Sequence, residues 1–317
     1  MKVLITGAAG NLGSHLTRYL LNDDSSLQLR LMLHKTPLPY DISSYQNAEI
    51  CKADLMNPDT LSGICVDVDC IVHFAGVLFA PRPESFLQVT NVTYFKNLVD
   101  AAIKVNVKKI ILISFPHVEG NTTPDNPAKG RLDGKPISVH AQTRLKEEQY
   151  LFEKCNGSLT VPISLRAGMI YGKNILMLDA GKYLMRKHLL AVWKKPTWIH
   201  LISIDDFCMA VKQAIIKKDV HGIYHLGDEK PLLLQEFLDK MAKHLHYHPP
   251  WRLPVWCIFT AAWLVEMFAL IFRTKSPLTR DFIKIGMVSY TGDILRMKNE
   301  LIPVLKYPTI VEGITTL

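Results

Sequence analysis

The chain lacks the sequence features of several protein classes. Its six cysteines form no Cys-x-x-Cys pair and show no metal-like spacing with histidine, so we expect buried thiols in a reducing compartment and no metal site. No repeat and no low-complexity tract occurs in the 317 residues, as is typical of a globular protein. No signal peptide precedes the first apolar run, and we therefore expect a cytoplasmic protein.

The basic residues are dispersed rather than clustered. The formal net charge is +8, but no basic block alternates with aromatic residues, so we expect no nucleic-acid partner. A basic surface also suits a cofactor that carries phosphates. With 48% hydrophobic and 21% charged residues, the length suits one large α/β unit with a smaller lobe, or two modest domains.

Residues 2–16, KVLITGAAGNLGSHL, contain the most informative pattern. An apolar run leads into Gly7, Gly10 and Gly13, after which a helical pattern begins. Gly7 allows a sharp turn, Gly10 allows backbone N–H groups to approach a pyrophosphate, and Gly13 allows the helix to lie close to the strand. The helix N-terminus then offers N–H donors and a partial positive charge. The segment therefore predicts a dinucleotide-binding loop.

Apolar runs alternate with helical patterns through the first half of the chain. Strands are expected at 3–5, 27–33, 70–74, 110–113 and 163–165. Helices are expected at 12–22, 84–105 and 140–154. This alternation predicts an α/β fold, a Rossmann doubly wound parallel sheet with a smaller C-terminal substrate lobe.

The same alternation suggests a division into domains. We assign residues 1–166 to an NAD(P)-binding Rossmann domain and expect residues 198–220 to return to it. From about residue 222 the alternation loosens. Residues 167–197 and 221–317 are therefore predicted to form the substrate-binding lobe.

Further motifs follow the glycine loop in order: Asp54-Leu55, His73-Phe74-Ala75-Gly76, Asn91, LRAGMIYG at 165–172 and ISIDD at 202–206. Over nearly the whole chain they resemble the extended short-chain dehydrogenase/reductase superfamily, of the nucleotide-sugar epimerase/dehydratase and 3β-hydroxysteroid dehydrogenase type. Together with the loop, the resemblance implies cofactor contacts at Gly7, Ala9, Gly10, Asn11, Leu12, Gly13, Asp54, Leu55, Phe74, Ala75, Gly76 and Asn91.

The end of the second expected strand bears on the choice of cofactor. An NAD site usually has a carboxylate there for the ribose 2′-hydroxyl. This strand instead ends Leu33-His34-Lys35, and Lys35 with His34, assisted by Arg30, suits a 2′-phosphate. We therefore expect NADP, with NAD as the alternative, unless these are simply surface residues.

The catalytic segment departs from the family pattern. The family uses a tyrosine, a lysine four residues later, and a serine or threonine at the preceding strand end. Here the tyrosine position is His140, the lysine position is Arg144, and the serine position is Phe115, next to Ser114. A literal Tyr-x-x-x-Lys, Tyr150 to Lys154, lies ten residues further along the same helix, ~15 Å away, and we interpret it as non-catalytic.

His140 and its neighbours can still support chemistry. Because histidine has an ordinary pKa of about 6.5, His140 is expected to exchange protons near neutrality, or to donate a hydrogen bond while neutral. The guanidinium of Arg144 is expected to hold ribose hydroxyls or a phosphate and to disfavour a charged His140. Ser114 is expected to orient the substrate, and His117 is a further candidate. The alternative is a site that has lost its chemistry.

Residues 253–272, LPVWCIFTAAWLVEMFALIF, form the longest apolar run. Its single charge, Glu266, argues against a membrane span, while Ala262, Glu266 and Ala269 share one helical face. The bulky residues lie on the opposite side. A core or lid helix of the lobe is the simplest interpretation. Peripheral membrane attachment and a true span remain alternatives, and so does an apolar substrate against the bulky face.

Three functions are open at this point. The first is an NADP-preferring oxidoreductase that acts on a secondary alcohol or ketone of a lipophilic, steroid- or ring-like substrate. The second is a non-catalytic NAD(P)-binding sensor or assembly protein, and the third is a nucleotide-sugar epimerase or dehydratase. The resemblance further implies a homodimer through the helices at 84–105 and 140–154.

Overall fold

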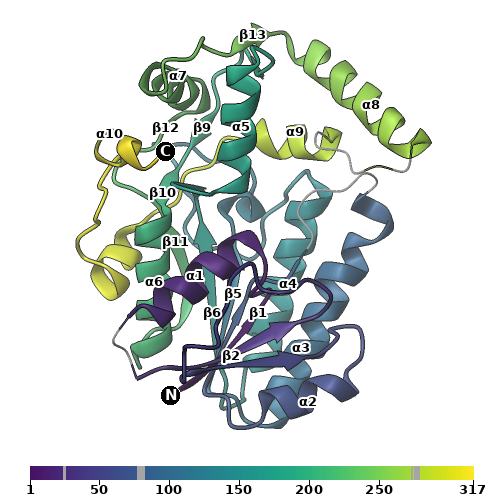
Figure 1. Ribbon diagram of the computed structural model, residues 1–317, viewed down its shortest axis with the longest axis vertical. Coiled ribbons are helices and arrows are strands. Elements are labelled where there is room, and N and C mark those ends of the chain that lie inside the picture. Colours follow the sequence, from purple (N-terminus) through teal and green to yellow (C-terminus); the bar gives the residue numbers. More distant parts are fainter. Residues whose placement is uncertain (24–25, 77–82, 273, 275–278) are drawn as a thin grey trace.

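The computed structural model describes residues 1–23, 26–76, 83–272, 274 and 279–317 (Figure 1). A seven-stranded parallel sheet lies at its centre, in the order β11-β6-β5-β4-β1-β2-β3. The strands are β1 (Lys2–Thr6), β2 (Gln28–Leu33), β3 (Ala48–Lys52), β4 (Cys70–His73), β5 (Lys109–Ser114), β6 (Val161–Ala167) and β11 (Gly222–Leu226). The strand order reverses between β1 and β4, the point at which doubly wound sheets bind ligands. The predicted Rossmann fold is confirmed.

Helices cover both faces of this sheet (Figure 1). On one face lie α1 (Asn11–Leu21) and α6 (Ile204–Ile216), and on the other α2 (Asp59–Cys65), α3 (Tyr94–Lys104) and α4 (Val139–Cys155). Side chains alternate along a strand, so Val3 and Ile5 join the hydrophobic cluster of α1 and α6, whereas Leu4 joins that of α2, α3 and α4. Burial on both faces explains why β1 reads as a continuous apolar run.

The rest of the chain forms short paired strands and helices above the carboxyl ends of the sheet. The strand pairs are β7 (Met169–Tyr171) with β10 (Leu201–Ser203), β8 (Ala191–Trp193) with β13 (Trp251–Leu253), and β9 (Trp198–Ile199) with β12 (Leu232–Leu233). The helices are α5 (Leu176–Arg186), α7 (Leu234–His244), α8 (Val255–Ile271), α9 (Arg280–Gly286) and α10 (Ile310–Gly313). Single-turn helices are η1 (Pro83–Ser85), η2 (Gln88–Thr93), η3 (Pro116–Glu119), η4 (Met297–Leu301) and η5 (Ile314–Thr316).

Two details differ from the sequence expectations. The sequence places residues 221–317 in the lobe, yet β11 (Gly222–Leu226) pairs with β6 and forms the last strand of the central sheet. The expected helix at 84–105 is divided into a 3-10 turn, the π-helical η2 and α3. The position of β11 depends on its pairing with β6, because a five-residue strand followed by turns has little periodic pattern in its sequence.

Helix α8 corresponds to the long apolar run. It has 17 residues, and Figure 1 shows it at the outer edge of the molecule, away from the central sheet. Within the described ranges, no helix has the length and apolarity needed to cross a membrane.

Candidate active site

The glycine loop connects β1 to α1 in the predicted way. Gly7 adopts a positive φ of 72°, which favours glycine, and a Cβ on Gly7 would lie 2.8 Å from the Ala75 nitrogen. A Cβ on Gly13 would lie 2.2 Å from the Gly7 carbonyl oxygen. Gly10 is the N-cap of α1 and offers no side-chain cap. The first turn of α1 is therefore open for an anion, and the loop is too tight for larger residues.

Asn11 joins this loop to the second lobe. Its Nδ2 donates to the Asn174 carbonyl oxygen at 2.8 Å, and its Oδ1 accepts from the Leu176 nitrogen at 3.2 Å. Asn174 has a positive φ of 61°. Ala9 and Leu12 flank the loop half-buried and pack against the cluster of α1 and α6. These two hydrogen bonds hold the glycine loop directly against the segment before α5.

The residues predicted to select the cofactor lie at the ends of β2 and β3. His34 and Lys35 are exposed, and His34 Nε2 lies 3.5 Å from Asp54 Oδ2. Leu55 is buried, and its carbonyl accepts from Asn97. Arg30, expected to assist Lys35, instead donates to Glu49 Oε1 at 2.6 Å and to two carbonyl oxygens beside α2. Because Arg30 lies mid-strand, its guanidinium is held at the sheet edge, away from the strand end.

The end of β4 brings three predicted residues together. A Cβ on Gly76 would lie 2.7 Å from Arg144 Nη2 and 3.6 Å from Asn91 Oδ1. Asn91 is buried and its Nδ2 donates to Thr143 Oγ1 at 3.4 Å. Ala75 packs against the α2–α4 cluster, and the Phe74 ring contacts Phe207 of α6 edge to face. Gly76, Asn91 and Arg144, which the sequence separates by up to 68 positions, therefore share one site.

Arg144 is buried and paired with a carboxylate. Its Nη1 lies 2.7 Å from Glu147 Oε2, one turn further along α4. Burial raises the pKa of Glu147 to about 7, against the opposing charge of Arg144. Within the described chain, Glu147 Oε1 has no hydrogen-bond partner. The sequence did not single out Glu147, because a glutamate in a helix usually faces solvent.

His140 lies in a row of aromatic rings. Its imidazole stacks on Phe115 with a centroid distance of 5.1 Å and an interplanar angle of 11°. Phe115 contacts His117 edge to face at 5.1 Å, and His117 contacts Tyr290 at 4.2 Å. Two of the three positions at which the family pattern is broken, His140 and Phe115, thus pack against each other. Tyr290 comes from a segment that is distant in the sequence from both His117 and His140.

The protonation state of His140 differs from the expectation of exchange near neutrality. Its side chain is 2% exposed, and burial, with Arg144 and His117 nearby, lowers its pKa to about 3. Burial likewise lowers the pKa of His117 to about 3, against the opposing effect of the Ile285 backbone. Among the described residues, neither ring nitrogen of His140 has a hydrogen-bond partner. His140 is therefore a neutral imidazole at pH 7, suited to donate a hydrogen bond rather than to act as a base.

The other two candidates have clear positions. Ser114 ends β5, and its buried Oγ has no partner in the part of the chain that the structure describes. Tyr150, of the literal Tyr-x-x-x-Lys, donates to Asp100 Oδ1 at 2.7 Å, and Lys96 lies 4.5 Å from its ring centroid. Tyr150 thus faces α3, which agrees with its interpretation as non-catalytic.

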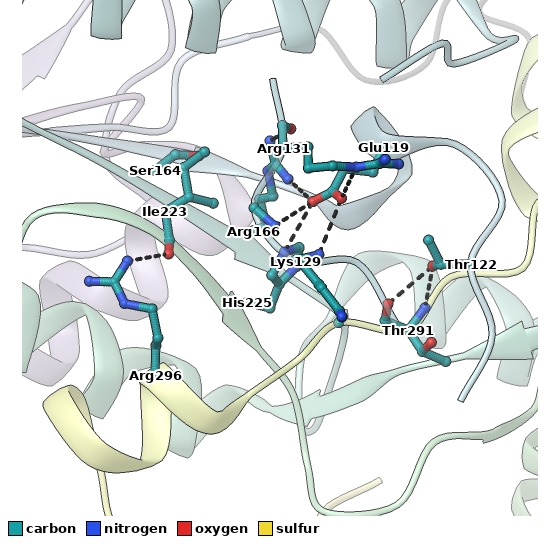
Figure 2. Close-up of polar contacts among 12 residues, drawn as sticks. Glu119, Thr122, Lys129, Arg131, Ser164, Arg166, Ile223, His225, Thr291 and Arg296 are labelled. Carbon is teal, nitrogen blue, oxygen red and sulfur yellow. Dashed lines mark hydrogen bonds and ion pairs between the residues drawn. The ribbon is translucent and has the colours of Figure 1, made fainter. Parts of the chain in front are cut away.

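A second buried cluster lies beside the site, on α4, β6 and η3. The sequence analysis did not predict it. Arg166 of β6 is fully buried and donates to both carboxylate oxygens of Glu148 of α4, at 2.6 Å from Nη2 to Oε2. It also donates to Glu119, at the end of η3. Figure 2 shows Glu119 between Arg166 and His225, whose Nε2 lies 3.3 Å from Glu119 Oε1.

This cluster, which we call the Arg166 network, joins four elements. Glu148 Oε1 also accepts from Ser164. Glu119 accepts from the backbone nitrogen of Lys129 (Figure 2) and from that of Gly130. It therefore ties α4, which carries His140, to the turn that carries His117. The one sequence feature that indicates it is an arginine inside the otherwise apolar run of LRAGMIYG.

Comparisons with known proteins agree with this geometry. The chain is 30% identical to a low-salt glycan biosynthesis protein of Haloferax volcanii over 76% of this chain and 81% of that protein. It is 24% identical to a uronate dehydrogenase of Pseudomonas syringae over 78% of this chain and 81% of that protein. The fold resembles that of UDP-glucuronic acid 4-epimerase from Bacillus cereus, solved with UDP-glucuronic acid and NAD. The TM-score is 0.75 at 17% identity, over 100% of this chain and 97% of that one.

The model of one protein family matches residues 3–227, which include the glycine loop, Arg144 and all of the central sheet except Lys2. Its members include enzymes of the extended short-chain dehydrogenase/reductase type, as the resemblance in the motifs implied. The chain belongs to the NAD dependent epimerase/dehydratase family.

Proposed function

We propose that the protein is a nicotinamide-dependent oxidoreductase that interconverts a hydroxyl and a carbonyl group, with neutral His140 as hydrogen-bond donor to the substrate oxygen. The observation that carries this proposal is the buried imidazole at the start of α4, with no partner for its ring nitrogens among the described residues. Leaving a buried donor unpaired costs about 1–3 kcal/mol, so a fold that keeps one at this position favours a ligand group that pairs with it.

The residues present fit a dinucleotide. The open first turn of α1, the tight glycine loop and the groove at Gly76 provide N–H donors and close approach, and the bound nicotinamide would supply the hydride chemistry. Arg144 lies against Gly76 and would hold the cofactor through ribose hydroxyls or a phosphate. Its Nη1 is held by Glu147 and its Nη2 lies toward Gly76, so Arg144 keeps a donor for the cofactor.

We expect NADP to bind more tightly than NAD. Exposed Lys35 and His34 follow β2 where NAD enzymes usually carry a carboxylate. Replacing Lys35 by glutamate should weaken NADPH binding about tenfold or more and leave NADH binding unchanged or stronger, as measured by fluorescence titration. Lys104→Glu, a similar exposed lysine at the far end of α3, is the matched control. Equal loss of both cofactors in Lys35→Glu would contradict the assignment.

A lipophilic alcohol or ketone is the first candidate substrate, because His140 lies at the end of a row of rings that continues through Phe115, His117 and Tyr290. A nucleotide sugar is the second, favoured by the family match and by the solved relative that holds UDP-glucuronic acid. Purified protein should be tested for NADPH oxidation with a panel of ketones, and for binding of UDP-sugars by calorimetry. Ketone turnover supports the first candidate, and tight UDP-sugar binding without it supports the second.

The role of His140 is tested by substitution. His140→Phe should abolish turnover while NADPH binding persists, and His140→Gln, which retains an N–H donor, should recover part of it. The matched controls Tyr150→Phe and Lys154→Ala lie on the same helix and should leave turnover unchanged. Full turnover in His140→Phe would contradict the proposed role.

The resemblance also implies a homodimer through α3 and α4, which we include in the proposal. The outer surface of these helices is polar, with Lys96 and Asp100 beside Tyr150. Sedimentation velocity should show a dimer that Tyr150→Asp weakens, because the interface would have to bury a new carboxylate. A monomer at all concentrations would contradict it.

A further inference from the structure

Helix α8 is apolar on the side that faces solvent. Its outward residues, which we call the α8 patch, are Trp256, Trp263, Leu264, Met267, Phe268, Ile271 and Phe272. Each is at least 39% exposed, and Trp256 and Ile271 reach 69%. At 100° per residue these positions span about half of the helix circumference. A helix that is apolar all round is normally buried, so this exposed half requires an explanation.

The inward half of α8 already has its partners. Ile258 and Ala262 pack with Val192, Trp193 and Ile283 in a small hydrophobic cluster separate from the main core. The single charged residue of the helix also points inward. Glu266 Oε1 accepts from the Arg280 nitrogen and Oε2 from Arg280 Nε, both at 2.7 Å. The protein thus pairs the one carboxylate of α8 and leaves its bulky apolar side chains outside.

Basic residues lie on the elements next to α8. Lys194 and Lys195 directly follow β8, and the Lys194 nitrogen donates to the Leu253 carbonyl oxygen at 3.2 Å, which places both lysines beside the start of α8. On the neighbouring α9, Arg280 and Lys284 are exposed. The carboxylate of Glu266 is neutralised by Arg280. An apolar strip with a cationic border is complementary to an anionic lipid surface, which attracts each nearby cation by about 1 kcal/mol.

We propose that α8 lies flat on an anionic lipid bilayer, with the α8 patch inserted at the level of the headgroups. The two exposed tryptophans suit this depth, because indole rings favour the membrane–water interface. The 17-residue helix, with Glu266 bound to α9, lies on the membrane rather than across it. The inference rests on α8 and its border alone and does not depend on the proposed function.

The docked helix is connected to the candidate active site. Asp281 Oδ1 of α9 accepts from the Val139 nitrogen at 3.2 Å, at the first residue of α4 and next to His140. Glu266, Arg280 and Asp281 therefore form a continuous path from α8 to the start of α4. Membrane contact through α8 thereby fixes the orientation of the site relative to the lipid surface.

The experiment is flotation of the full chain with vesicles of phosphatidylcholine alone or mixed with phosphatidylglycerol. The protein should float with the mixed vesicles and much less with phosphatidylcholine, and high salt should release it. Phe268→Gln with Ile271→Gln should reduce binding about tenfold or more, since each removes apolar area from the interface. Leu159→Gln, an exposed leucine elsewhere, is the matched control and should bind normally.

Tryptophan fluorescence gives an independent measurement. Binding to mixed vesicles should shift the emission to shorter wavelength, and Trp256→Phe with Trp263→Phe should remove most of that shift. Absence of flotation with folded wild-type protein would overturn the proposal. So would self-association in lipid-free solution that Phe268→Gln with Ile271→Gln abolishes, because the patch would then be covered by a second copy of the chain.

Discussion

Helix α4 carries two buried charge clusters that differ in how completely their polar groups are paired. Toward its start, Arg144 makes one ion pair with Glu147, whose second oxygen has no partner in the described chain, and His140 is likewise unpaired there. Further along, Glu148 accepts from Arg166 and Ser164 with both oxygens. Arg166 also reaches Glu119.

This difference in pairing indicates different roles for the two clusters. Arg166 and the carboxylates of Glu148 and Glu119 are all hydrogen-bonded, which offsets the cost of burying their charge, so the Arg166 network can hold α4, β6 and η3 rigidly. Incomplete pairing costs stability and leaves donors and acceptors for a ligand. We therefore interpret the start of α4 as the reactive end and the Arg166 network as its support. Four substitutions test this comparison.

The largest effect is expected from breaking the Arg166 network. Arg166→Met leaves Glu148 and Glu119 as buried carboxylates without their cation and should cost about 3–5 kcal/mol in the free energy of unfolding, measured by urea denaturation. Arg166→Lys keeps the charge but loses the bidentate contact with Glu148. Its free energy of unfolding should lie between those of Arg166→Met and wild type. Arg131→Ala, at the exposed rim of the network, should cost under about 1 kcal/mol. Equal costs for Arg166→Met and Arg131→Ala would refute the supporting role.

The next effect is a pH dependence from Glu147. Burial raises its folded-state pKa from 4.5 to about 7, so its contribution to stability is complete below about pH 4.5 and is lost as the pH rises through 7. Glu147→Gln removes this loss. The variant should be more stable than wild type near pH 8 by up to about 3 kcal/mol and nearly equal near pH 5, measured by urea denaturation at both values.

Glu153→Gln, an exposed glutamate on the same helix, is the control and should follow wild type at both pH values. Parallel stability curves for Glu147→Gln and wild type would show that Glu147 is ionised over the whole range, and would remove the contrast with Glu148.

A smaller effect, of opposite sign, is expected at His140. His140→Phe replaces an unpaired buried donor by an apolar ring that can stack on Phe115, and should raise the stability of the free protein by about 1 kcal/mol. Thermal denaturation measures the change. His221→Phe, at an exposed histidine, should leave the melting temperature unchanged. A destabilised His140→Phe would indicate that His140 is a structural residue.

The smallest effect is expected at an exposed ion pair. Lys298 Nζ lies 2.6 Å from Glu229 Oε1, a shorter distance than that between Arg144 and Glu147, but both side chains are more than a third exposed. Lys298→Ala should change the free energy of unfolding by less than about 1 kcal/mol. A cost comparable to that of Arg166→Met would show that distance rather than burial determines the energies of these pairs.

The elements predicted correctly are those with a strong local pattern. β1, β4 and β5 are buried on both faces and read as apolar runs, and α1 shows clear helical periodicity. β3 was missed because it lies at the sheet edge and is largely exposed, so AEICK has no apolar run. β11 was assigned to the substrate-binding lobe rather than to the central sheet, because its position in the sheet depends on pairing with β6.

The sequence by itself determined the glycine loop and the parallel sheet, because backbone geometry and strand burial constrain residues that are neighbours in the chain. His140 and Arg144 were identified as candidates through the resemblance to the family pattern. Only the tertiary structure determined the contacts and the protonation states of the side chains at the site. The stack of His140 on Phe115, the pairing of Arg144 with Glu147 and the Arg166 network join segments that are distant in sequence or depend on burial. Burial sets the local dielectric, which fixes the charge of His140, and no local pattern encodes it.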